Sequence, residues 1–182
     1  MSDFTFLRAY KVLNAEQNNG LDTVFYPVTD EEITSLETEL QSKLPAELAD
    51  FYSQVGYDFI KKGTGKRNLF MDTYSLQDIN LRRGDFEYDP DLEIYADIYN
   101  DDKLLFFEVN EGVYLAIDKF DNKEKNAVYY FKDKIADSLE ELIHKILEQP
   151  DFLNEYWHRK SSNIGCEIFK QGLKEVFLYK GK

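Results

Sequence analysis

The Gly-Thr-Gly-Lys loop at residues 63–66 is the part of this sequence closest to a chemical motif, because glycines before a lysine can cradle phosphate. A phosphate-binding P-loop needs a first glycine five residues before the Gly-Lys pair and a Ser or Thr directly after the lysine. Ile60 and Arg67 occupy those positions. The spacing fails at both ends, so we interpret residues 61–67 as an exposed basic loop.

The histidines and the single cysteine do not form a set that could catalyse a reaction or bind zinc. His144 lies among the apolar positions of a predicted helix, and His158 lies in a polar run. Cys166 precedes Glu167, and a neighbouring carboxylate does not lower a thiol pKa. The two histidines are too far apart in sequence, and the cysteines too few, for a tetrahedral zinc site. We predict no catalytic residue, no cofactor and no metal site, although counting residues leaves a carboxylate-bound metal open.

Residues 84–102 are the most biased stretch of the chain, with eight acidic residues and no Lys or Arg. In an extended segment, acids at every second position would share one face. Such a row would steer a cationic protein towards it, and an exposed tyrosine could add a packing anchor. The candidate partner-binding residues are Asp85, Glu87, Tyr88, Asp89, Asp91, Glu93, Asp97, Asp101 and Asp102. The alternative is a solvated loop that only buries some of its aromatic residues.

The composition favours a protein partner over nucleic acid. The chain has 182 residues and a net charge of −13, so its surface repels phosphate backbones. The N-terminus lacks the basic stretch and apolar run of a signal peptide, and no window approaches the ~18 apolar residues of a membrane span. A single cysteine can form no intramolecular disulfide. We therefore expect a cytoplasmic protein that binds no membrane, and the oligomeric state stays open.

Helices with clear start signals flank the acidic stretch. Thr29 and Glu32 form a capping box, and the helix that follows should end at Leu44-Pro45. A second helix should bury a stripe and stop at Gly56. The buried stripe is Leu48, Phe51, Tyr52 and Val55. Ser138 starts another helix with apolar residues on one face, and Pro150 follows its end.

Strand signals lie between these helices. The patterns predict one strand at residues 69–71 and a hairpin formed by residues 104–109 and 113–117. They predict a further strand at residues 127–131. The sequence thus predicts an α+β fold, with an antiparallel-rich sheet and flanking helices. We expect a helical N-terminal extension at 1–26, one α+β domain at 27–150, and a basic C-terminal extension at 151–182 that packs on it.

The order of these signals resembles the SUKH superfamily, a Smi/Knr-type group. The N-terminal part of the resemblance is the run from Val28 to Ile33, then Leu44-Pro45 and the helix that ends at Gly56. The later part is the strand and helix order at residues 105–107, 112, 114–118, 128–131 and 138–142. The resemblance covers about residues 27–148. The usual glycine before Leu-Pro is absent, and the double glycine after the second helix is reduced to Gly56-Tyr57.

The resemblance implies an α+β domain that works by binding another protein. Bacterial members are taken to be immunity proteins that bind a cognate toxin, often a nuclease, and the family has no common catalytic residues. An acidic inhibitor can imitate the phosphate field that a basic nuclease site attracts. Our leading hypothesis is therefore a non-enzymatic immunity protein whose partner is a basic toxin domain. The alternatives are a regulatory scaffold in cell-envelope assembly, as fungal relatives suggest, and, third, an enzyme.

Overall fold

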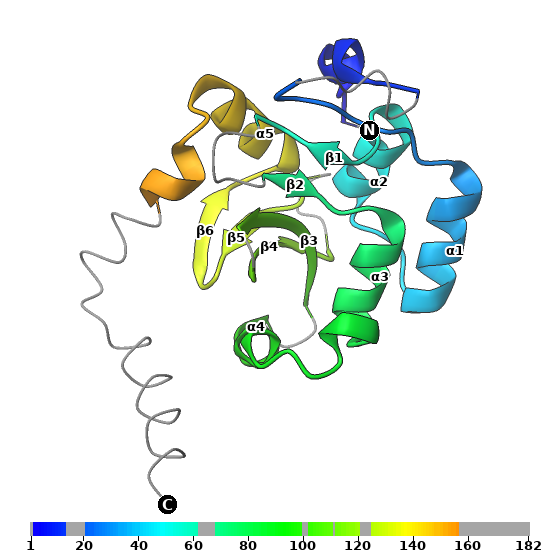
Figure 1. Ribbon diagram of the computed structural model, residues 1–182, viewed down its shortest axis with the longest axis vertical. Coiled ribbons are helices and arrows are strands. Elements are labelled where there is room, and N and C mark those ends of the chain that lie inside the picture. Colours follow the sequence, from blue (N-terminus) through cyan, green and yellow to red (C-terminus); the bar gives the residue numbers. More distant parts are fainter. Residues whose placement is uncertain are drawn as a thin grey trace, which may run out of the picture.

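The chain folds around a six-stranded antiparallel sheet in which every strand pairs with its neighbour in sequence (Figure 1). The computed structural model describes residues 2–13, 21–61, 68–99, 102–110, 112–120 and 125–156. The strands are β1 Asp58–Phe59, β2 Leu69–Phe70, β3 Lys103–Asn110, β4 Val113–Asp118, β5 Val128–Tyr130 and β6 Asp133–Ala136. The helices are α1 Asp30–Leu40, α2 Ala46–Gln54, α3 Thr73–Leu81, α4 Asp91–Tyr99 and α5 Leu139–Glu148. Two 3-10 helices are η1 Thr5–Tyr10 and η3 Gly84–Phe86. The predicted α+β class is confirmed.

Local capping explains where the predicted helices begin. The end of α1 differs from the prediction, because Gln41 adopts a left-handed C-cap conformation and the helix ends at Leu40, before Leu44-Pro45. The Thr29 side chain accepts from the Glu32 N–H at 3.2 Å, and the Glu32 carboxylate accepts from the Thr29 N–H at 2.7 Å, which confirms the capping box. Pro45 is the N-cap residue of α2, and Ser138 caps α5 by accepting from the Glu141 N–H. The helix α3 and the strand β6 are additions that the sequence patterns did not indicate.

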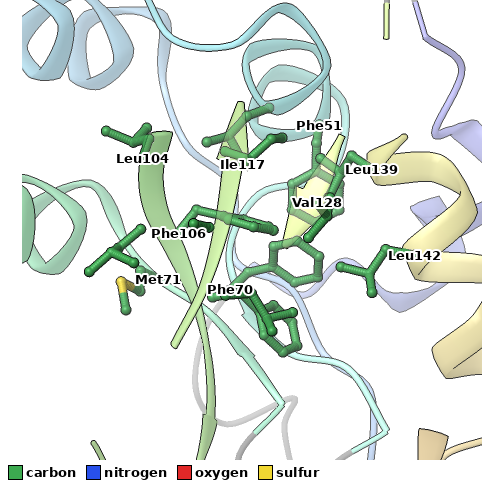
Figure 2. Packing of buried hydrophobic residues seen from close by; sticks show 14 of the residues in the cluster. Phe51, Phe70, Met71, Leu104, Phe106, Ile117, Val128, Leu139 and Leu142 are labelled. Carbon is green, nitrogen blue, oxygen red and sulfur yellow. The ribbon is translucent and has the colours of Figure 1, made fainter. Parts of the chain in front are cut away.

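The apolar core lies between the sheet and the helices α2 and α5 (Figure 2). Figure 2 shows Phe51 of α2 and Leu139 of α5 converging on Phe70, Phe106 and Val128 of the sheet. The predicted α2 stripe is confirmed, because Leu48, Phe51, Tyr52 and Val55 are all fully buried. Burial of this many aromatic rings supplies the main driving force for folding.

The helix α3 lies beside the edge of β3, whereas α4 packs on the face of the sheet opposite α2 and α5. The Asn80 amide of α3 donates to the Leu105 carbonyl at 2.8 Å and accepts from the Leu105 N–H at 3.0 Å, so it occupies the place of a neighbouring strand. Tyr114 alternates with Leu115 along β4 and therefore points to this face, where the Tyr95 ring of α4 lies 5.8 Å from it. The second face thus holds α4, which carries part of the acidic stretch.

The N-terminal segment contributes to the same core. Phe4, Leu7 and Phe25 are fully buried and belong to the cluster that contains Phe51. The segment also extends the sheet, because Tyr26 and Tyr57 form an antiparallel bridge. The division at residue 26 stays a prediction, and so does the role of the basic C-terminal extension. Leu153 is buried and Phe152 packs against the core, whereas residues 157–182 lie outside the described residues.

Replacing Phe4 with alanine should lower the free energy of unfolding by about 3 kcal/mol, because it empties a fully buried site whose ring packs edge-on against Phe51 at 5.5 Å. Phe6 is 39% exposed and stacks on His144 at 4.7 Å, so Phe6→Ala should cost about 1 kcal/mol or less. Urea unfolding followed by far-UV circular dichroism measures both. Equal losses would show that the N-terminal segment does not pack as described.

Candidate functional site

The acidic stretch folds into a 3-10 turn followed by a helix. Residues 84–86 form η3, residues 91–99 form α4, and Pro90 lies in the turn between them. The extended geometry, in which acids at every second position share one face, is therefore wrong for this segment. A helix has a period of 3.6 residues, so the acids of α4 spread around its axis instead of forming one row.

Apolar anchors hold the acidic stretch against the sheet. Leu92 is fully buried, and Tyr95 is 3% exposed. The Tyr95 hydroxyl accepts from the Tyr114 N–H at 2.9 Å, and its ring stacks on Phe131 at 5.3 Å. Phe86 of η3 also packs against the core. The stretch is thus a structured part of the domain with one buried side, and not a fully solvated loop.

The other side of the stretch presents acids and a tyrosine to solvent. Asp85, Glu87, Glu93 and Asp102 are exposed, and Tyr88 is 86% exposed. The hydrogen bond with the Glu87 carboxylate, more than burial, raises the pKa of the Tyr88 phenol. Asp89 is half-buried. The side chains of Asp91 and Asp97, and the whole of Asp101, lie outside the described residues.

Two arginines lie where α3 ends and the acidic stretch begins. The Arg82 guanidinium donates to the main-chain carbonyl of Leu92 and, at 3.5 Å, to that of Asp89. Arg83 instead forms an ion pair with Glu39 of α1, at 2.9 Å between Nη1 and Oε2. Both members of that pair are about half exposed, so its contribution to stability is small. The first arginine therefore holds the acidic stretch, and the second ties α1 to α3.

Of the two histidines and the cysteine considered for chemistry, the structure describes His144. His144 is exposed and stacks on Phe6, away from the acidic stretch. The loop at residues 62–67, His158 and Cys166 lie outside the described residues. In the described ranges, no three His, Cys, Asp or Glu side chains gather in a way that could hold a metal ion. A shallow polar cavity of about 340 Å³ lies at the end of α1 and includes Thr34, Glu37 and Lys43.

Sequence reasoning missed one residue that organises the domain, Glu47. This carboxylate is 1% exposed, and its Oε2 accepts from the Asn126 N–H at 2.6 Å and the Leu139 N–H at 3.1 Å. It joins α2 to the start of α5 and to the segment before β5. The available signal was spacing, because Glu47 lies four residues before Phe51 and hence on the buried face of α2.

The described fold is an α+β domain whose candidate site is a charged surface on an anchored segment. The sequence profile of the SMI1 / KNR4 family (SUKH-1) matches residues 27–145. The chain belongs to this family, which confirms the resemblance. It is also 42% identical over 144 residues to the "Immunity protein YxxD" of Bacillus subtilis (strain 168), a match that covers 79% of this chain and 94% of that protein. No solved structure shows a significant match. None of the described helices is both long and apolar enough to cross a lipid bilayer.

Proposed function

We propose that this chain is an immunity protein that binds a cognate toxin protein and neutralises it without catalysis. The observation that carries this proposal is the 42% identity to an immunity protein, over 94% of that relative's length. Membership of the SMI1 / KNR4 family over residues 27–145 agrees with it. The place of action is the cytoplasm, where an intracellular toxin would have to be blocked.

The binding surface in this proposal is the exposed side of the acidic stretch. Asp85, Glu87 and Glu93 are exposed, and none of them forms an ion pair with a Lys or Arg in the part of the chain that the structure describes. Their charge adds to a net charge of −13 and attracts a cationic partner. A toxin with a nuclease site fits this field, since such a site must itself attract phosphate. Tyr88 lies among these acids and offers an aromatic contact.

Co-purification tests the proposal. The full chain is tagged, isolated from its native host in moderate salt, and its bound proteins are identified. The expected result is a toxin encoded by the neighbouring gene, whose toxicity disappears when the two proteins are expressed together. Recovery of cell-envelope or signalling proteins would favour a regulatory scaffold instead. Recovery of the toxin without protection in co-expression would contradict neutralisation.

Neutralising two exposed acids, Asp85→Asn with Glu87→Gln, should slow association with that partner about three- to tenfold at low salt and flatten its salt dependence. The stability of the fold should change little, because both side chains are exposed. Surface plasmon resonance at two salt concentrations measures the rates. The matched control is Glu140→Gln with Glu148→Gln, which removes the same number of negative charges from α5. Figure 1 shows α5 in the upper part of the domain and α4 at the bottom. Equal slowing by both pairs would mean that only total charge matters and that the acidic stretch is not the contact surface.

A further inference from the structure

Arg82 occupies an unusual position between α3 and the acidic stretch. It is the C-cap residue of α3 and adopts the left-handed conformation, with φ of 54°, which non-glycine residues rarely adopt. From there its guanidinium reaches the carbonyl of Leu92 in the first turn of α4, and the carbonyl of Asp89 at 3.5 Å. One side chain thus bridges the turn that separates η3 from α4.

The choice of acceptors is informative. Carboxylates are the stronger acceptors for a guanidinium, and residues 84–102 contain eight of them. Arg82 nevertheless bonds main-chain oxygens, while its neighbour Arg83 pairs with the Glu39 carboxylate of α1. Arg82 therefore does not pair with the exposed carboxylates of Asp85 and Glu87, although it lies beside the acidic stretch.

We propose that Arg82 is a positioning residue for partner binding, which fixes the turn at residues 87–92 through its main chain and leaves the exposed carboxylates of Asp85 and Glu87 to face the partner. This inference rests on the proposed function and assigns Arg82 a role in the same surface. A fixed turn lowers the entropy that the complex must lose, because Glu87 and Tyr88 are already held near their bound arrangement. Leu92 and Tyr95 anchor the helix beyond the turn, so Arg82 controls the turn itself.

Removal of the Arg82 side chain should change the affinity for the partner in opposite directions, depending on whether its charge or its positioning of the turn matters more. Arg82→Gln makes the surface more negative, so electrostatic attraction alone would strengthen binding to a cationic partner. Loss of the two carbonyl bonds would free the turn and weaken binding. Arg83→Gln is the matched control, since it removes the same charge one residue away and breaks only the exposed pair with Glu39.

The test measures the binding rates of full-length Arg82→Gln, Arg82→Lys and Arg83→Gln, with the purified protein that co-purifies with the tagged chain as the probe. We expect Arg82→Gln to raise Kd about tenfold through faster dissociation. Arg82→Lys should recover part of the loss, because one ammonium can still donate to a carbonyl. Arg83→Gln should leave Kd unchanged or lower it within about twofold. Amide exchange of residues 87–92 in the free chain should rise only in the Arg82 variants.

Other outcomes separate the two proposals. If Arg82→Gln binds as Arg83→Gln does, while Asp85→Asn with Glu87→Gln still slows association, the positioning role is wrong and the binding surface stands. If neither the acid variant nor the arginine variants change binding, the acidic stretch is not the binding surface. The proposed role of Arg82 is then wrong as well. Failure to recover a toxin would overturn the proposed function and, with it, this inference.

Discussion

Replacing Glu47 with alanine is expected to lower the free energy of unfolding by about 3–5 kcal/mol. The carboxylate is 1% exposed and satisfies the N–H groups of Asn126 and Leu139, which would lose their acceptor in the buried interior. The Glu47 N–H also donates to the Asn126 side chain at 3.1 Å, so the two residues bond reciprocally. Chemical denaturation of the full chain, followed by far-UV circular dichroism, gives the loss.

Two further variants identify the cause of that loss. Glu47→Gln keeps the shape and one oxygen that can accept from both N–H groups, but it removes the negative charge that strengthens these bonds, so it should cost about 1–3 kcal/mol. Glu31→Ala removes an exposed carboxylate from the first turn of α1, where only the helix dipole is affected, and should cost about 0.5 kcal/mol. A Glu47→Ala variant as stable as Glu31→Ala would show that Glu47 is not the buried link between α2 and α5.

Gly56→Ala is the second substitution with a large expected effect, a loss of about 3–5 kcal/mol. Gly56 has φ of +121°, and a Cβ added there would lie 1.8 Å from the Tyr26 carbonyl oxygen. That oxygen accepts from the Tyr57 N–H at 3.0 Å, in the bridge that attaches the N-terminal segment to β1. An alanine would therefore push apart the main chains of two segments, because no flexible side chain can move aside instead.

Gly84→Ala is the matched control, because it places an alanine in a positive-φ conformation without a close contact to its Cβ. Gly84 also has a positive φ, of +57°, but the nearest atom to an added Cβ is the Asp78 side chain at 3.7 Å. Its cost should be about 1 kcal/mol, which is the cost of the left-handed conformation alone. Both losses follow from the same unfolding measurement. Similar losses for the two glycines would mean that Tyr26 does not approach Gly56 as closely as described.

These variants also help to separate stability from recognition. Glu47, Gly56 and Phe4 lie in the interior or at a crossing of main chains, whereas Asp85 and Glu87 are exposed. Variants of the first group should lower the amount of folded protein, and variants of the second should change association rates. A test of the proposed protection against a toxin needs both measurements, because loss of folded protein alone would also remove any protection.

Local sequence signals were sufficient where the residues that set the structure are close in the chain. The capping box at Thr29, the start of α2 after Pro45 and the hairpin of β3 and β4 are all found where the patterns predicted them. Each depends on contacts within a few residues, so the sequence carries the whole signal. The family match covers the part of the chain that contains these elements, residues 27–145.

The conformation of the acidic stretch was not predictable in this way. Alternating acids and apolar residues at 85–93 suggested an extended segment, yet the chain forms η3 and α4 there. The deciding contacts come from distant residues, because Leu92 and Tyr95 bury themselves on the sheet and Tyr95 bonds Tyr114. Tertiary burial outweighs the weak local preference of such a segment.

The sequence by itself thus determined the fold class, the starts of α1, α2 and α5, the hairpin, the family and a net charge of −13. The tertiary structure alone decided which acids are exposed, that Arg82 bonds the Leu92 carbonyl instead of a carboxylate, and that Glu47 is buried against Asn126 and Leu139. The physical reason is the separation along the chain of the residues that decide each feature. Caps and turns are set by neighbours in the chain, whereas exposure and the partners of a charged group depend on residues that only the folded chain brings together.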